Sequence, residues 1–348
     1  MKKILLVIAF LSTLIYTSCS SDENGGSSGS NYTSITTTSN SYDLDIDELA
    51  TFTTKSNTNT TIISNITYYV NDVAITGNTY TFTSSGTYNV YSKYVKGSTT
   101  LTSATIEIAV YDKISFNKRV LIEDFTGTWC GYCPRVAYAI DQVNNQTTDA
   151  TVVAIHRGSD PYNFTGASSL ESQIGLTGYP TAMLNRTTDW SYPEPSYVSQ
   201  AVNLTTGTNP YVGLALVTST SGNTSTVEVK AKFGKNFSDL KLVVYALEDN
   251  LIYNQTNYTA YYGGTSTIAN FEHNHVLRAV LSSDILGETV TGSTNLNDEF
   301  SKTFTYNIPS PGVNANNVHF VAFIVDSSKK ALNSRAAGAN ETQSFEIE

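Results

Sequence analysis

Two cysteines stand three positions apart, at Cys130 and Cys133, with Gly131 and Tyr132 between them. The chain has three cysteines in all, and the third, Cys19, lies far from this pair. Two thiols at this spacing can form a disulfide and exchange it with the cysteines of another protein. The pair therefore predicts redox chemistry, and the two residues between the cysteines are predicted to influence the reduction potential.

The residues after Cys130 predict a helix that the CxxC motif opens. Val136, Ile140 and Val143 recur at helical spacing, which places apolar side chains on one face. A thiol at a helix N-terminus meets unpaired amide N–H groups and the positive end of the helix dipole, which favour the thiolate. We therefore predict that Cys130 is the attacking nucleophile and that Cys133, one turn further in, is the resolving thiol.

The residues around this pair resemble the active site of thioredoxins. Trp129 precedes the pair, a predicted buried strand ends near Asp124, and Tyr179-Pro180 stands before another predicted strand. The resemblance implies that Asp124 is a buried acid that relays a proton to or from Cys133. It also implies that Pro180 is a cis-proline that presents backbone to a substrate chain. Four residues are expected to form the substrate-binding surface: Trp129, Gly131, Tyr132 and Tyr179.

Two other roles are open for the cysteine pair. A zinc site usually needs four ligands and the chain has no second CxxC, although His273 and His275 could complete a Cys2His2 set. A disulfide with a purely structural role fits the same spacing. We expect no metal and no cofactor besides the disulfide itself. Of the remaining polar residues, Glu123 is predicted to lie at the surface, His156 to be a satisfied polar residue, and His319 receives no function.

The N-terminus predicts export and lipid attachment. Two lysines precede the apolar run 4–15, which is shorter than the roughly 20 residues of a membrane-spanning helix. Thr17-Ser18-Cys19 follows and resembles a bacterial lipobox, although Thr17 and Ser18 replace the commonest residues, Ala and Gly. The resemblance implies cleavage before Cys19 and lipid on its sulfur. An ordinary secretory signal with an incidental cysteine is the alternative.

The predicted compartment and the net charge of the chain limit the classes of partner that we expect. Export to an oxidising compartment favours a disulfide between Cys130 and Cys133. With lipid on Cys19, no other disulfide can form within the mature chain. A net charge of -10 at pH 7 repels nucleic acid, so nucleic acid is not expected as a partner. The expected partners are cysteine-containing exported proteins, a thiol electron donor or acceptor, and the membrane through the lipid anchor. The predicted location is the outer membrane, facing the periplasm or the cell surface.

Changes in residue pattern divide the chain into five parts. A signal peptide is predicted over 1–18 and a flexible tether over 19–32. Strand-like runs separated by turn residues predict an immunoglobulin-like β-sandwich over 33–112. Alternating strands and helices predict a thioredoxin-like domain over 113–208, and strands return over 209–348. The predicted fold class is multidomain α+β, with a thioredoxin-like α/β domain flanked by an N-terminal immunoglobulin-like β-sandwich and a C-terminal β-sandwich.

This layout resembles the outer-membrane-protein-28-related family of lipoproteins with a thioredoxin-like domain. The resemblance covers residues 115–348 and depends on the segment TWCGYCP at 128–134 and the run HNHVLR at 273–278. It implies an outer-membrane lipoprotein. It gives no established substrate, and it assigns no catalytic role to His273 or His275.

Two hypotheses from different classes follow. The first is a cell-envelope thiol–disulfide oxidoreductase, of reductase or isomerase type, that acts on exported proteins. The second is a surface-exposed adhesion or ligand-binding lipoprotein that uses the thioredoxin fold as a scaffold. Loss of both thiols would abolish the first function and leave the second intact. The presence of Asp124, Trp129 and Pro180 together with both thiols favours the enzyme.

Overall fold

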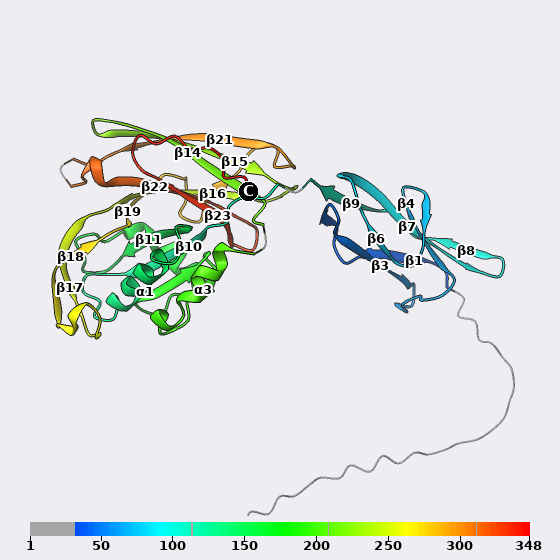
Figure 1. Cartoon of the computed structure of the whole chain (residues 1–348), viewed down its shortest axis with the longest axis horizontal. Helices are drawn as coiled ribbons and strands as arrows, with labels where there is room; N and C mark the ends of the chain where they lie inside the picture. Colours follow the sequence, from blue (N-terminus) through cyan, green and yellow to red (C-terminus); the bar gives the residue numbers. More distant parts are fainter. Residues whose placement is uncertain (1–31, 113, 208, 311) are drawn as a thin grey trace, which may run out of the picture.

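The computed structural model describes residues 32–348 except positions 113, 208 and 311 (Figure 1). The predicted signal peptide, the predicted lipidation site Cys19 and all but the last residue of the predicted tether lie outside the described residues. Within the described part, no helix is long and apolar enough to cross a membrane.

Strands β1 to β9 form two sheets that share one core. The first sheet has the order β1-β3-β6, and the second has the order β2-β9-β7-β4-β5 with β8 beside β7. Side chains alternate across each strand, so one face of each sheet supplies buried residues such as Phe52, Tyr68, Val90 and Ile108. The strands are β1 (Ile35–Ser39), β2 (Asp43–Asp45), β3 (Leu49–Ser56), β4 (Ile66–Val70), β5 (Val73–Ile75), β6 (Thr79–Thr81), β7 (Gly86–Lys96), β8 (Thr99–Thr102) and β9 (Ile106–Tyr111).

A nine-stranded sheet organises the rest of the described chain. Its order is β13-β12-β10-β11-β19-β16-β22-β23, with β20 paired to β16. The strands are β10 (Val120–Thr126), β11 (Ala150–His156), β12 (Thr181–Leu184), β13 (Thr188–Asp189), β16 (Lys241–Glu248), β19 (Val276–Val280), β20 (Glu288–Thr289), β22 (Val318–Val325) and β23 (Ala331–Ala337). The Ala331 N–H at the start of the edge strand β23 donates to the carbonyl of Asn185, which follows β12.

The predicted fold class, a thioredoxin-like α/β domain between two sandwiches, is wrong. Strand β11 pairs in parallel with β19, where Ala154 lies opposite Val276, so strands from both sides of the predicted boundary belong to one sheet. The described residues are mainly strand, with three short α-helices and no separate thioredoxin-like core. The error has a physical cause. An edge strand must satisfy its outer N–H and C=O groups, and the strand that does so here lies more than a hundred residues away, where local patterns cannot reveal it.

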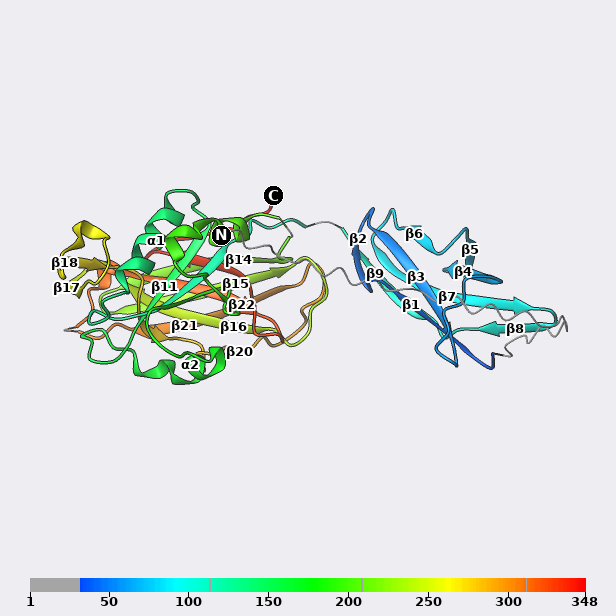
Figure 2. The same cartoon turned by 90° about the horizontal axis from the view of Figure 1, so that it is seen from below.

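Different elements cover the two faces of the large sheet. Helices α1 (Pro134–Asn144) and α3 (Val198–Val202) pack against one face beside β10, β11 and β12. Farther along this face lies a three-stranded sheet in the order β14-β15-β21. Helix α2 (Ser168–Ile174) lies on the opposite face, and Figure 2 shows α1 and α2 on opposite sides of the strands. The small sheet contains β14 (Val212–Ser221), β15 (Thr224–Phe233) and β21 (Glu299–Asn307).

A two-stranded hairpin extends from the sheet, and we call residues 251–273 the arm. It consists of β17 (Leu251–Thr256) and β18 (Thr267–His273), coloured yellow in Figure 1 and lying beside α1 in both views. Near its tip the ring of Tyr261 stacks on that of Tyr138, with centroids 4.4 Å apart. The Tyr262 hydroxyl donates to Asp141 at 2.8 Å. The arm therefore packs along α1 through aromatic and polar contacts.

A buried ion pair joins distant strands across the sheet. Glu123 on β10 is 0% exposed, so the prediction that it lies at the surface is wrong. Its Oε1 lies 3.2 Å from Nη2 of Arg186, which also donates to the Tyr245 hydroxyl at 2.6 Å and to the Ile285 carbonyl at 2.9 Å. The guanidinium lies 4.7 Å from the ring centroid of Phe323. These contacts connect β10, the turn after β12, β16 and β22.

Replacing Arg186 with Met should destabilise the protein, because it leaves the Glu123 carboxylate buried without a partner. We expect urea denaturation to show a loss of about 3–5 kcal/mol in the free energy of unfolding. The double variant Arg186→Met/Glu123→Leu should recover most of the loss, because neither charge then remains buried. Equal losses in the single and double variants would contradict this account.

Candidate functional site

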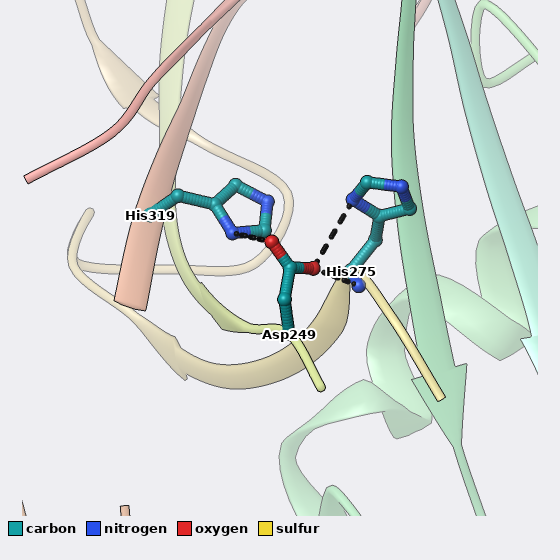
Figure 3. Close-up of side chains that lie close together, drawn as sticks. All are labelled: Asp249, His275 and His319. Carbon is teal, nitrogen blue, oxygen red and sulfur yellow. Dashed lines mark hydrogen bonds and ion pairs between the residues drawn. The ribbon is translucent and has the colours of Figure 1, made fainter. Parts of the chain in front are cut away.

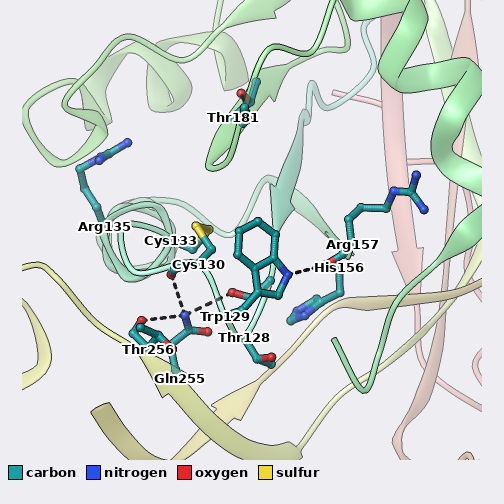
Figure 4. Close-up of a disulfide and its surroundings, with 12 residues drawn as sticks. Thr128, Trp129, Cys130, Cys133, Arg135, His156, Arg157, Thr181, Gln255 and Thr256 are labelled. Carbon is teal, nitrogen blue, oxygen red and sulfur yellow. Dashed lines mark hydrogen bonds between the residues drawn. A yellow bond between two sulfur atoms is a disulfide. The ribbon is translucent and has the colours of Figure 1, made fainter. Parts of the chain in front are cut away.

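The predicted redox pair forms a disulfide at the start of α1. Cys130 and Cys133 are bonded, with Cα atoms 5.4 Å apart, and Figure 4 shows the bond at the end of the helix. Helix α1 begins at Pro134, which lacks an N–H and so suits the first helical position. The predicted apolar helix face is confirmed, because Val136, Ile140 and Val143 are all buried. Cys130 and Cys133 are only 4% and 2% exposed.

Exposed aromatic side chains lie next to both cysteines in the chain. Trp129 and Tyr132 are 42% and 54% exposed. The Trp129 indole N–H donates to the Arg157 carbonyl at 2.6 Å, and its ring meets that of Tyr179 edge to face at 5.6 Å between centroids. The Tyr179–Pro180 peptide bond is cis. The structure therefore brings the predicted substrate-binding residues Trp129 and Tyr179 together beside the pair.

Asp124 lies behind the disulfide. It is buried on β10, and its Oδ1 has no hydrogen-bond partner. Burial raises the pKa of this carboxyl well above its usual value, the Glu194 carboxylate raises it further, and Arg135 lowers it. Asp124 and Cys133 both line a cavity of about 490 Å³, which His156 and His273 line as well. The predicted acid and the predicted resolving thiol thus open onto the same space.

The arm contributes site residues that the sequence did not indicate. The buried Gln255 side chain donates to the Cys130 carbonyl at 2.9 Å, from a position 125 residues farther along the chain. The backbone N–H of Thr256 donates to the Thr128 carbonyl at 2.9 Å, and that of Tyr258 donates to the Gly131 carbonyl at 2.7 Å. The arm therefore extends along the cysteine loop as an added strand would. No signal near the cysteines could have revealed these contacts.

A histidine network supports the loop on another side. His156 Nδ1 lies 3.0 Å from Asp160 Oδ2, which also accepts from the Thr128 N–H at 2.5 Å. The prediction that His156 is a satisfied polar residue is therefore confirmed. The His273 ring lies 5.1 Å from that of His156, and burial followed by the charge of His156 lowers the pKa of His273 to about 4.

The structure does not assemble the zinc site that the sequence left open. His273, His275 and Cys133 line the same cavity, but both cysteines are engaged in the disulfide. The Nδ1 of His275 lies 3.5 Å from Asp249 rather than at the cysteines. The two histidines of the run thus have different surroundings.

Comparison with known proteins identifies the class. The model of the family described as outer membrane protein Omp28 matches residues 167–343. This chain belongs to the Omp28 outer membrane protein family. The matched residues include the HNHVLR run at 273–278 and exclude the cysteine pair, so the thioredoxin-like domain expected with the family is not supported.

One solved structure shows a likeness of fold alone, and a second matches with a lower score. HBP35 of Porphyromonas gingivalis is 19% identical with a TM-score of 0.53, over 66% of this chain and 78% of that chain. A structural-genomics target from Agrobacterium tumefaciens is 13% identical with a TM-score of 0.41, over 65% of this chain and 96% of that chain. The comparison with curated proteins finds no match.

Replacing Gly131 with Ala should displace the arm, because a Cβ atom at this position would collide with the Tyr258 ring. We expect a loss of about 1–3 kcal/mol in the free energy of unfolding, as for other overpacked sites. The double variant Gly131→Ala/Tyr258→Ala should regain part of it. The matched control is Gly178→Ala, where the added Cβ meets nothing within 4 Å. An unchanged stability of Gly131→Ala would contradict the packing.

Replacing Asp124 with Asn should stabilise the protein at neutral pH. The folded-state pKa of Asp124 is raised, so its carboxyl favours folding below its unfolded pKa and loses that contribution as pH rises through the folded pKa. Chemical denaturation from pH 4 to 8 should therefore show that the free energy of unfolding of the variant, relative to that of the wild type, increases as the pH rises.

The variant Asp160→Asn is a control for which we expect a stability change of the opposite sign. Burial raises the pKa of Asp160, but the His156 hydrogen bond and the amide donors outweigh burial and lower it. Its contribution is present above the unfolded pKa and is lost as pH falls through the folded pKa. Asp160→Asn should therefore be less stable than the wild type at neutral pH. The same sign for both variants would contradict these assignments.

Proposed function

We propose that the Cys130–Cys133 pair catalyses thiol–disulfide exchange on exported proteins in the cell envelope. The observation that carries the proposal is a disulfide at the N-terminus of α1 whose inner cysteine shares a cavity with an unpartnered buried carboxyl, Asp124. Helix N-termini favour thiolates, and a carboxyl with a raised pKa can exchange protons near neutral pH.

The reaction would start from the reduced pair. The Cys130 thiolate attacks one sulfur of a substrate disulfide, a mixed disulfide forms, and the other substrate sulfur leaves as a thiolate that takes a proton from water. Asp124 accepts the proton of the Cys133 thiol. The Cys133 thiolate then attacks Cys130 Sγ, which releases the second substrate thiolate and oxidises the pair. A thiol donor must supply two electrons to restore the dithiol, whereas isomerisation ends with the pair reduced.

The outer aromatic surface would hold the substrate chain. Trp129, Tyr132 and Tyr179 lie beside the disulfide, and Trp129 is fixed through the Arg157 carbonyl. Lipid on Cys19 would tether the protein to the outer membrane, with the domain facing the periplasm or the cell surface. The partners are then cysteine-containing exported proteins and a thiol donor or acceptor.

A ligand-binding lipoprotein with a structural disulfide is the second candidate. The observation that favours it is the low exposure of Cys130 and Cys133, together with the arm that is hydrogen-bonded to their loop. Adhesion or ligand binding at the exposed aromatic surface would then proceed without the thiols.

The reduction potential distinguishes the two candidates. We expect the pair, equilibrated in glutathione buffers, to give a value between about -120 and -270 mV, the range of catalytic dithiols. A value below about -300 mV would mark a structural disulfide and support the second candidate.

Single cysteine variants provide a second readout. Cys133→Ser should accumulate mixed disulfides with exported proteins, because the resolving thiol is absent. Cys130→Ser is the matched control and should accumulate none. Full exchange activity in Cys130→Ser would overturn the mechanism.

A further inference from the structure

Three potential metal ligands meet at one end of the large sheet, and one of them, His275, also lines the cavity that Cys133 lines. Asp249 follows β16, His275 precedes β19, and His319 is the second residue of β22. Strand β16 lies between the other two, and its last residue, Glu248, pairs with Val276 on one side and Val318 on the other. Figure 3 shows the two imidazole rings on either side of the Asp249 carboxylate.

The spacing of the ligand atoms is close to that around a metal ion. His319 Nδ1 lies 3.0 Å from Asp249 Oδ2, and His275 Nδ1 lies 3.5 Å from Asp249 Oδ1. One ligand atom from each residue lies within 4.8 Å of the others. Ligands at about 2.0–2.1 Å from a tetrahedral zinc ion lie roughly 3.3 Å from one another. Small side-chain rotations would therefore bring all three onto one ion.

The backbone holds this arrangement in place. The His275 N–H donates to Asp249 Oδ1 at 2.6 Å, and the Asp249 N–H donates to the Asn317 carbonyl at 3.0 Å. His275 has a φ of 59°, in the left-handed region that few residues other than glycine adopt. Its carbonyl accepts from the Ala154 N–H at 2.8 Å, which fixes that conformation between β11 and β19.

The Nδ1 nitrogen of His319 has no aligned hydrogen-bond partner among the described residues. His319 Nδ1 is buried and makes no aligned hydrogen bond, although the Asp249 carboxylate lies 3.0 Å away. A cation placed between the two atoms would satisfy this nitrogen, as would a protonated ring paired with the carboxylate.

We propose that Asp249, His275 and His319 bind a divalent metal ion of the zinc type. Two imidazoles and one carboxylate are a ligand set that suits zinc and neighbouring first-row transition metals. The three side chains are 30%, 35% and 14% exposed, so water can complete the coordination. The proposal is independent of the exchange reaction.

The test is a Zn²⁺ titration of the mature full-length protein with its disulfide intact, against a chromophoric chelator. We expect one equivalent to bind with a Kd below about 10 μM. Asp249→Asn, His275→Gln and His319→Gln should each weaken binding by at least about 100-fold, the upper end of the effect typical of outer-shell partners.

Two controls separate this site from the cysteines. His273→Gln, in the same HNHVLR run, and the double variant Cys130→Ser/Cys133→Ser should both bind Zn²⁺ as the wild type does. Absence of saturable binding would overturn the proposal, as would full affinity in all three ligand variants or loss of binding in the cysteine variant.

A measurement on the wild type avoids dependence on folding of the variants. Histidine ring nitrogens can be followed by ¹⁵N NMR as Zn²⁺ is added. The signals of His275 and His319 should shift together at one equivalent, while those of His156 and His273 stay unchanged. Shifts of His156 and His273 alone would refute the assignment.

Discussion

The cysteine site and the Asp249 cluster both depend on the parallel pairing between β11 and β19. Ala154 donates to the His275 carbonyl and lies opposite Val276, so β19 continues the sheet that β10 and β11 begin. The arm ends at His273, two residues before this contact, and is therefore fixed beside α1, where it covers the cysteine loop. The same contact holds His275 next to Asp249. A single strand pairing thus positions the arm over the disulfide and completes the three-ligand cluster.

Buried polar groups in this sheet fall into two kinds. Glu123 has its countercharge and hydrogen-bonding neighbours in Arg186 and Tyr245, so its burial contributes to the connection between strands. Asp124, the next residue on the same strand, keeps one carboxylate oxygen without a partner and has a raised pKa. A group that is costly to ionise in the folded state is the kind that active sites retain, because its proton is held ready for transfer. Two adjacent acids on one strand therefore have opposite surroundings, since Glu123 is paired and Asp124 is not.

Local patterns in the sequence were sufficient for the cysteine pair and for α1. Their signals, CxxC spacing and apolar residues at helical spacing, extend over about a dozen residues. The predicted fold class was wrong because β11 pairs with β19 through residues 154 and 276. A periodic pattern of residues along the chain does not reveal a contact between such distant positions. The prediction that Glu123 lies at the surface was wrong for a related reason. Strand alternation places a residue on a face, but both faces of β10 are buried here. Gln255 and the Asp249 cluster come together only once the sheet has formed.

While the disulfide is formed, the two candidate sites do not compete for a metal ion. Thiolates are strong zinc ligands, and a reduced CxxC in reach of two histidines would draw the ion from an oxygen and nitrogen site. In the disulfide, both sulfurs are bonded to each other and neither can bind as a thiolate. His275 is held beside Asp249 by its own N–H and beside β11 by its carbonyl, so it is available to a metal ion while the disulfide is formed. An oxidising envelope would favour this separation, since it keeps most disulfides formed.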